Sequence, residues 1–264
     1  MAHDPTYGNL CLGVGAAHAG SDWLRSALTG HPAMSVCPMA DVDYFHHRHM
    51  GGGAPGRAAR AARLQAAPDP LPPGWATHYL SDPVDDAWYL RLFADASHHA
   101  YRCDFSDSAA FLSAADWRRI EAQCDRLRVI FTMCDPLARL WRHGLARHAG
   151  AAQPDLRRFL DCPDIRRAGD YGATLAAMQD GLTEGAWRVV FHEDIGDDPL
   201  FMLRRIEQFL GLAPDPDLEP PPMAERHPPP PDADEVPRDV ANLLRRVRRD
   251  VEEAGFSPPD CWSL

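Results

Sequence analysis

The sequence contains no lysine, so all 27 of its permanently positive side chains are arginines. A Walker-type phosphate loop needs a lysine at the nucleotide phosphates, which argues against a P-loop kinase or nucleoside triphosphatase. Any cation at a functional site is therefore an arginine or one of the 13 histidines. The net charge of −11 argues against general binding to nucleic acid or to an anionic membrane surface.

The sequence also has no C-x-x-C motif, no signal-peptide pattern at its start and no apolar run of membrane-spanning length. Its seven cysteines are scattered and odd in number, which is typical of reduced thiols in a cytoplasmic protein. The run YFHHRHM at 44–50 lacks the i, i+4 histidine spacing of a zinc-binding helix. We therefore predict no metal site and interpret this run, which includes Arg48, as a polar surface patch.

Short apolar runs alternate with helical patterns along the chain, at a hydrophobic content of 45% that is typical of a globular protein. This alternation indicates an α/β fold with a central, mainly parallel sheet flanked by helices. No linker or internal repeat divides the sequence, so we expect one domain over 1–264. We predict strands at 9–14, 34–38, 99–105, 127–133 and 187–194, and helices from residue 21 and at 88–96, 135–148, 199–210 and 238–254.

Local signals mark the two ends of the helix at 199–210. Asp198 and Pro199 are typical of an N-cap and a first helical residue, and Gly211 is typical of the residue that ends a helix. The inward face of this helix is predicted to contain Leu200, Leu203, Ile206 and Leu210.

Two segments do not have the pattern of regular elements. Residues 51–75 are rich in glycine, alanine and proline, which predicts a mobile surface segment with a short helix in its middle. Residues 214–237 contain too many prolines for regular structure and are predicted to form an extended strap. The amphipathic pattern of 238–254 predicts a final helix whose arginines face water.

Residues 13–32, GVGAAHAGSDWLRSALTGHP, combine a glycine-rich loop with the start of a helix. A strand that runs through glycines into a helix N-terminus presents backbone N–H groups and the positive end of the helix dipole to an anion. The interval from Gly15 to Gly20, followed by Ser21, is that of a P-loop without its lysine. The sequence therefore predicts an anion site at this loop.

Four segments in the same order resemble the sulfotransferases that use 3′-phosphoadenosine 5′-phosphosulfate (PAPS). Residues 127–143, LRVIFTMCDPLARLWRH, resemble the family's 3′-phosphate segment through Asp135, Pro136 and Arg139. Residues 188–212 are similar to the family's closing segment, which ends in FLGL. The residues that match the family's 5′-phosphosulfate loop and the segment after it are Gly20, Trp23, Leu24, His31, Pro32, Tyr44 and Phe45.

The resemblance implies a sulfotransferase fold, similar to that of the P-loop NTPases, and in-line transfer of a sulfuryl group from PAPS to a hydroxyl or amine. The acceptor is then a carbohydrate or another small molecule, with the 44–50 patch on the acceptor side. His18 and Asp41 stand at the positions of the catalytic residues. The donor-binding positions correspond to Gly15, Ala19, Gly20, Ser21, Asp22, Trp23, Cys134, Arg139, Arg142 and Arg226.

Several of these positions depart from the family pattern. His18 replaces the loop lysine or arginine, and it is either a protonated donor or a neutral residue with no role. Asp22 replaces a threonine; pointing inward, its charge costs roughly 4 kcal/mol, about a thousandfold in phosphate affinity. Pointing outward, it stabilises the helix dipole by about 0.3–1 kcal/mol. Asp41 replaces a glutamate and is either the base or a surface acid.

The 3′-phosphate segment departs in the same way. Cys134 stands where the family has an arginine, and we interpret it as a packed thiol rather than a nucleophile. Arg142 stands in place of a serine and restores the lost charge from the next helical turn. Two hypotheses follow: a divergent active sulfotransferase with weakened donor binding, or an inactive binding or regulatory module with the same fold.

Overall fold

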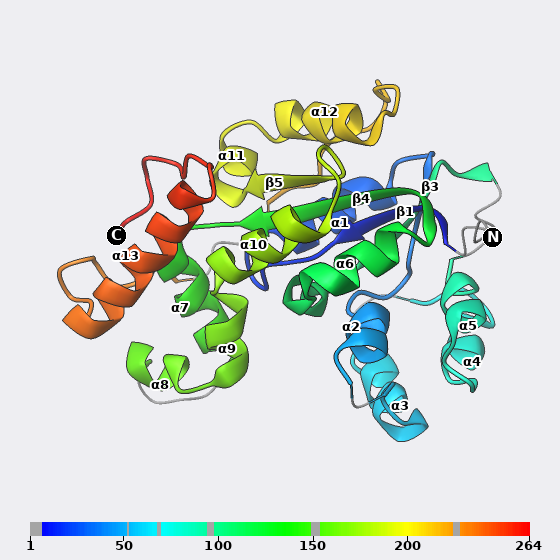
Figure 1. Ribbon diagram of the computed structural model, residues 1–264, viewed down its shortest axis with the longest axis horizontal. Helices are drawn as coiled ribbons and strands as arrows, with labels where there is room; N and C mark the ends of the chain where they lie inside the picture. The colour runs from blue at the N-terminus through cyan, green and yellow to red at the C-terminus, as the bar shows by residue number, and fades with distance from the viewer. Residues whose placement is uncertain (1–6, 52, 68–69, 94–97, 149–153, 224–227) are drawn as a thin grey trace.

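A parallel five-stranded sheet forms the centre of the computed structural model, which describes residues 7–51, 53–67, 70–93, 98–148, 154–223 and 228–264 (Figure 1). The strand order is β2-β3-β1-β4-β5, with every neighbouring pair parallel. In this order β1 lies between β3 and β4, and the chain builds the sheet outward from β1 in both directions. Sheets of this kind bind ligands at the carboxyl end of the strand where the direction changes, which here is β1. The strands are β1 (Gly8–Gly13), β2 (Met34–Val36), β3 (Tyr101–Phe105), β4 (Cys124–Met133) and β5 (Trp187–Phe191).

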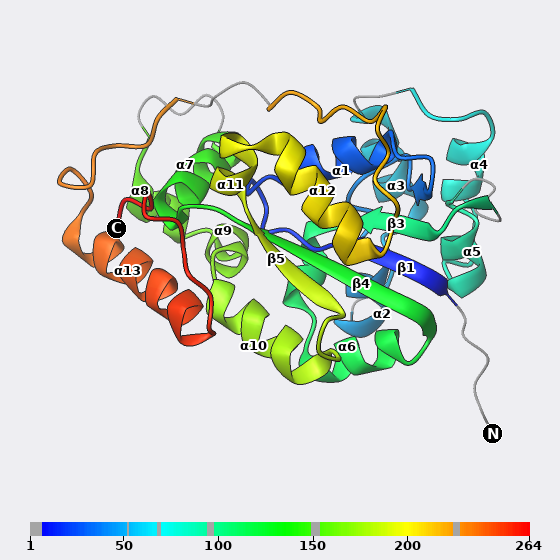
Figure 2. The same cartoon turned by 90° about the horizontal axis from the view of Figure 1, so that it is seen from above.

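Helices cover both faces of this sheet. On one face, α1 (Ser21–Thr29) and α12 (Pro199–Leu210) pack their leucines against Cys11, Cys103 and Ile130. The other face is covered by α6 (Ala114–Glu121) and α10 (Tyr171–Gly181), which lie on the opposite side of the sheet from α12 (Figures 1 and 2). Alternate side chains of a strand point to opposite faces, which gives the sheet two apolar clusters.

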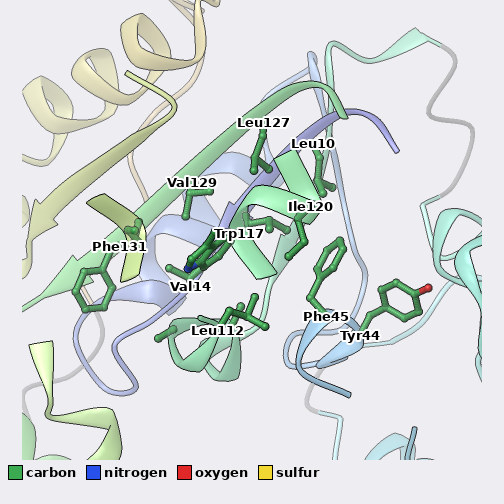
Figure 3. Packing of buried hydrophobic residues seen from close by; sticks show 14 of the residues in the cluster. Leu10, Val14, Tyr44, Phe45, Leu112, Trp117, Ile120, Leu127, Val129 and Phe131 are labelled. Atoms are coloured by element: carbon green, nitrogen blue, oxygen red, sulfur yellow. The ribbon is translucent and has the colours of Figure 1, made fainter. Parts of the chain in front are cut away.

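The larger cluster contains most of the buried aromatic residues. Trp117 and Ile120 of α6 lie against Leu10 and Val129 of the sheet, with Phe45 at the edge of the same cluster (Figure 3). Phe45 belongs to α2 (Tyr44–His49), the first of the short α-helices that the described residues form between β2 and β3. The others are α3 (Arg57–Gln65), α4 (Trp75–Tyr79) and α5 (Asp86–Leu90).

A third cluster lies beyond the carboxyl end of β4, where the chain enters α7 (Pro136–Arg147). There α7 packs against α8 (Leu156–Leu160), α9 (Pro163–Ala168) and α13 (Arg238–Glu253). Two shorter elements also start from carboxyl ends of strands, namely the 3₁₀ helix η2 (Asp107–Phe111) after β3 and α11 (His192–Asp197) after β5. The carboxyl edge of the sheet therefore gathers segments from the whole chain.

The structure confirms the predicted α/β class and the parallel sheet. The helix predicted at 88–96 is α5, which ends at Leu90, and residues 94–97 lie outside the described residues. The strand predicted at 187–194 ends at Phe191, because α11 begins at His192. Across the residues that the structure describes, no helix combines the length and apolar composition needed to cross a bilayer.

The ends of α12 follow their local signals, although its predicted inward face was partly wrong. The Asp198 side chain accepts a hydrogen bond from the Phe201 N–H, and Gly211 adopts a left-handed φ of 69°. Leu200, however, is 47% exposed in the first turn of the helix. Leu203, Ile206 and Leu210 belong to the apolar cluster against the sheet, whereas Leu200 does not.

Candidate functional site

The glycine-rich loop 14–20 joins β1 to α1 at the carboxyl edge of the sheet. It is held against β4, since the Ala16 N–H donates to the Thr132 carbonyl over 2.6 Å. The Thr132 hydroxyl in turn donates to the Gly15 carbonyl over 2.8 Å. Among the residues that the structure describes, no side chain caps the N-terminus of α1, and the first N–H groups of an α-helix have no partner within the helix. This end of α1 is therefore a fixed set of donors suited to an anion.

Gly20 precedes α1 in a left-handed conformation with φ of 103°. A Cβ atom at this position would lie 2.9 Å from Nδ1 of His192, closer than such atoms approach. Both the backbone conformation and the close contact with α11 therefore require glycine here. His18 also has a left-handed φ, of 63°, which turns the loop before α1.

Arg139 of α7 is buried, at 2% exposed. Its guanidinium donates to the Ile165 carbonyl of α9 over 3.0 Å and to Nδ1 of His143 over 3.3 Å. The His143 ring lies 4.8 Å, centroid to centroid, from the ring of His18. Burial, followed by the charge of Arg139, lowers the pKa of His143 to about 3, so this imidazole is neutral at pH 7.

A second arginine of α7, Arg142, makes a similar contact with a histidine. Its guanidinium lies 3.4 Å from Nε2 of His192 and 2.8 Å from Sγ of Cys134. Burial, followed by the charge of Arg142, lowers the pKa of His192 to about 4. None of the salt bridges found among the described residues involves Arg139 or Arg142. The α7 side of the loop thus carries positive charge that no carboxylate neutralises, which suits an anion.

The opposite side of the loop is acidic. One carboxyl oxygen of Asp107 lies 3.3 Å from the place that a Cβ atom of Gly15 would occupy. The Ser21 hydroxyl donates a hydrogen bond to the Asp107 carboxyl. The Asp107 backbone N–H donates to the Asp41 carboxylate over 3.1 Å. Burial, followed by the charge of Asp41, raises the pKa of Asp107 to about 8, so this carboxyl is mostly protonated at pH 7.

Asp22 and Asp41 differ in their surroundings. Asp22 is exposed in the first turn of α1, which is where a carboxylate stabilises the helix dipole. The Asp41 residue also reaches solvent, but desolvation by the protein around its carboxyl raises its pKa. The charge of Asp43 raises it further, against the hydrogen bond from the Asp107 N–H. Asp43 itself is paired with Arg63 of α3 over 2.8 Å.

Cys134 is fully buried between the end of β4 and α10. Its backbone N–H lies 3.5 Å from the Tyr171 hydroxyl, which donates to the Cys134 carbonyl over 3.0 Å. Burial raises the pKa of the thiol to about 12, even though Arg142 lowers it. The thiol is therefore neutral at pH 7 and fills space beside the guanidinium of Arg142.

Asp135 fixes the start of α7 and so positions Arg139 and Arg142. One carboxylate oxygen accepts the Leu137 N–H over 2.7 Å, and the other accepts hydrogen bonds from the backbone and hydroxyl of Ser263. The Asp135 N–H donates to the Glu193 carboxylate of α11 over 2.7 Å. The end of β4, α11 and the C-terminal segment are thereby joined behind the loop.

The structure brings most of the predicted site residues to this loop. Ala19 and Trp23 are buried beside it, and the Trp23 indole donates to the Pro221 carbonyl over 2.9 Å, which joins α1 to the described part of the 214–237 strap. Arg226 lies outside the described residues. No group of histidine, cysteine and acidic side chains with metal-binding geometry occurs among the described residues.

Sequence reasoning missed three residues of this site, namely Asp107, His143 and His192. His192 directly follows β5 and Asp107 lies two residues after the end of β3, so both belong to the carboxyl edge of a parallel sheet, where ligands bind. His143 follows Arg139 by four residues on one helix, a spacing that places the two side chains together. These two signals were present in the sequence.

Comparison with solved structures identifies the fold. No protein-family model matches the chain, and no curated protein is significantly similar to it in sequence. A sulfotransferase from Alicyclobacillus acidocaldarius is similar with a TM-score of 0.67 at 18% identity, over 99% of each chain. The sulfotransferase domain of the Synechococcus PCC 7002 olefin synthase is similar with a TM-score of 0.60 at 17% identity, over 98% of this chain and 100% of that domain.

A third structure supports the same conclusion. The sulfotransferase domain from the curacin biosynthetic pathway is similar with a TM-score of 0.56 at 14% identity, over 96% of this chain and 99% of that one. The chain therefore has the sulfotransferase fold along nearly its whole length, as the sequence resemblance predicted. Its glycine loop lies at the start of that fold, between the first strand and the first helix.

Proposed function

We propose that the protein binds PAPS and catalyses sulfuryl transfer to a hydroxyl or amine of a carbohydrate or other small molecule. The observation that carries this proposal is the loop 14–20 beside two arginines, Arg139 and Arg142, that have no salt-bridge partner among the described residues. When bound, PAPS supplies the sulfuryl group and 3′-phosphoadenosine 5′-phosphate (PAP) is released. The loop N–H groups and the dipole of α1 hold the 5′-phosphosulfate, and Arg142 holds the 3′-phosphate.

The acidic residues near the loop are compatible with this ligand because one is mostly neutral at pH 7 and another is exposed to water. Asp107 is compatible with an anion at the loop because burial raises its pKa to about 8 and keeps it mostly neutral at pH 7. Asp22 is exposed, so its charge is screened by water and stabilises the α1 dipole. The donor affinity is nevertheless weaker than that of a loop with a lysine and two threonines.

Asp41 is proposed as the base that accepts the proton of the acceptor. Its raised pKa makes the carboxylate a stronger base than an ordinary aspartate, as general-base catalysis requires. The Asp107 N–H holds one of its oxygens, which orients the carboxylate. His18 lies in the loop itself, where a donor stabilises the charge that develops on the leaving oxygen.

Calorimetric titration with PAP tests donor binding, and transfer from radiolabelled PAPS to a panel of sugar and amine acceptors tests catalysis. We expect a micromolar dissociation constant for PAP. We also expect that His18→Ala and Asp41→Ala each abolish transfer without changing the circular dichroism spectrum. No binding at millimolar PAP would contradict the proposal and favour an inactive module with this fold. Unchanged transfer in both variants would remove the site assignment.

A further inference from the structure

A buried carboxyl near the end of β3, that of Asp104, takes no part in the chemistry proposed above. The residue is 1% exposed, and burial is the main cause that raises the pKa of its carboxyl to about 7. Taking a carboxyl group out of water costs free energy, which an apolar side chain at this place would avoid. The contacts of its two oxygens therefore have to account for an aspartate at this position.

Each carboxyl oxygen of Asp104 accepts a hydrogen bond from a hydroxyl group. Oδ2 accepts from Tyr89 of α5 over 3.1 Å, and Oδ1 accepts from Ser106 over 2.9 Å. A serine hydroxyl has one proton and two lone pairs, so the bond to Asp104 turns the lone pairs of Ser106 toward other donors. The Ser106 oxygen accepts the backbone N–H of Asp43 over 3.1 Å. Asp104 is thus connected to the segment 41–43 through a single serine.

The segment 41–43 has a backbone conformation that its surroundings must impose. Asp41 and Asp43 have left-handed φ angles of 52° and 55°, which are uncommon for residues other than glycine. The Asp41 N–H donates to the Phe105 carbonyl over 2.7 Å, and the Ser108 hydroxyl donates to the Asp43 carboxylate. Together with Ser106, the end of β3 and the residues after it therefore hold this turn, which carries the proposed base.

We propose that Asp104 is a positioning residue for Asp41: it orients the Ser106 hydroxyl, which holds the Asp43 N–H and keeps the 41–43 turn in the conformation that presents the Asp41 carboxylate to the acceptor. The inference deepens the proposed function and rests on it for the role of Asp41 as the base. The conformation of the turn does not depend on that role, so it can be tested without a transfer assay.

Asp107 reports the position of the Asp41 carboxylate. The Asp107 N–H donates to that carboxylate, and the charge of Asp41 is the largest cause after burial of the Asp107 pKa of about 8. The charges of Asp22 and Asp43 raise this pKa as well, and Asp43 belongs to the same turn. Displacement of the turn weakens the repulsion, so the pKa of Asp107 is expected to fall. Carbon NMR of the side-chain carboxyl groups measures this pKa in the protein without a substrate.

Two substitutions break the connection to the turn, and a third is their matched control. Asp104→Leu removes the acceptor that orients the hydroxyl, and Ser106→Ala removes the hydroxyl itself. Tyr89→Phe removes the other hydrogen bond to Asp104 and leaves Ser106 in place. Asp104→Asn keeps an oxygen that accepts from Ser106, so it is expected to restore most of what Asp104→Leu loses.

We expect Asp104→Leu and Ser106→Ala to lower kcat about tenfold to a hundredfold, because a displaced base is poorly aligned with its proton. Their affinity for PAP is expected to stay within about twofold of the wild type, since the turn does not hold the donor. The pKa of Asp107 should fall below about 8 in both variants and stay there in Tyr89→Phe. The double variant should lose no more than the weaker of the two single variants, because both act through one contact.

An Asp107 pKa that is unchanged in Ser106→Ala, or an equal loss of kcat in Tyr89→Phe and Ser106→Ala, would overturn the inference. Thermal unfolding shows which variants are folded. If Asp104→Leu does not fold, the comparison of Ser106→Ala with Tyr89→Phe decides the question. If the wild-type protein transfers no sulfuryl group, the proposed function fails, and the titration of Asp107 still decides whether Asp104 and Ser106 position the turn.

Discussion

The backbone N–H of Asp107 donates a 3.1 Å hydrogen bond to the side chain of Asp41, which joins the segment after β2 to the segment after β3. The charge of Asp41 consequently opposes ionisation of the Asp107 carboxyl and helps to raise its pKa. The Asp107 carboxyl also lies over Gly15 and is bonded by Ser21, at the entrance of the loop. The protonation state of Asp107 therefore decides whether this carboxyl adds a negative charge beside the anion site.

Anion binding is predicted to weaken above pH 8. Asp107 has a pKa of about 8, so it is neutral below that pH and becomes negative above it. A new charge beside the ligand repels it, and we expect PAP affinity to fall about tenfold between pH 7 and 9. Asp107→Asn keeps the neutral form at every pH, and its affinity is expected to stay constant over that range. Parallel pH dependences of the two proteins in calorimetry would contradict this assignment.

The same group contributes to the pH dependence of folding. A carboxyl whose pKa is higher in the folded protein than in the unfolded chain binds its proton more tightly when folded. The free energy by which this proton stabilises the folded state is fully present below pH 4 and is lost as the pH rises to about 8. Asp107→Asn is therefore expected to be more stable than the wild type at pH 8, by about 1–3 kcal/mol after allowance for partial exposure. Urea unfolding at pH 5 and pH 8 measures the difference in unfolding free energy between Asp107→Asn and the wild type. The same difference at both pH values would contradict this prediction.

Replacement of Gly20 by alanine is predicted to impair both folding and anion binding. The φ of 103° strains any other residue, and the new Cβ atom would lie 2.9 Å from Nδ1 of His192. Gly51 provides a matched control, since its φ is 83° and a Cβ atom there has nothing within 4 Å. We expect Gly51→Ala to lose about 1–2 kcal/mol of stability from backbone strain and Gly20→Ala to lose more. Equal unfolding free energies and equal PAP affinities would indicate that the His192 contact is unimportant.

The variant Arg139→Met tests whether the positive charge of Arg139 binds an anion or only supports the packing of the fold. Methionine fills a similar volume, and removal of a buried charge offsets the lost hydrogen bonds to Ile165 and His143, so stability should change by less than about 2 kcal/mol. If the positive charge serves an anion, PAP affinity should fall about tenfold. A large loss of stability with unchanged PAP affinity would instead show that Arg139 serves the packing of α9.

Arg60 is predicted to anchor the segment between α2 and α4. The residue is 2% exposed, and its side chain donates to the carbonyls of Leu80 and Ser81 and to the Asp82 carboxylate, the last over 2.8 Å. Arg60→Ala leaves these acceptors without a partner, and we expect a loss of about 2–4 kcal/mol in thermal or urea unfolding. The exposed Arg57 of the same helix is the control, and Arg57→Ala should be within about 0.5 kcal/mol of the wild type. Similar losses in both variants would rule out the anchor.

Several elements were predictable because their signals are local. The strand at 9–14, the glycine loop and the helix from Ser21 follow one another in the structure as they do in the sequence pattern. Asp198 and Gly211 end α12 as expected, since caps depend on the geometry of a few adjacent residues. The short helix α2 was not predicted because a single turn and a half shows no clear periodicity.

The orientation of single side chains depended on distant segments. Arg139 was assigned to the donor phosphate from its place in a motif, whereas in the fold its guanidinium contacts the Ile165 carbonyl of α9 and a histidine one turn away. The sequence did not decide whether the Asp22 side chain points toward the anion site or away from it, and in the structure the residue is exposed. Neither arrangement can be deduced from spacing within α1 or α7, because both depend on what packs against those helices.

The sequence by itself determined the α/β class, the strand–loop–helix unit and the resemblance to sulfotransferases, since these depend on hydrophobic periodicity and short motifs. Only the tertiary structure decided which charges meet at the loop. Asp107 and His192 are far from the loop in the chain, but Asp107 reaches Gly15 and His192 reaches Gly20 because parallel strands end at the same edge of the sheet. Burial at that edge then raises the pKa of Asp107 to about 8 and lowers that of His192 to about 4, so at pH 7 the Asp107 carboxyl is mostly protonated and the His192 ring is neutral.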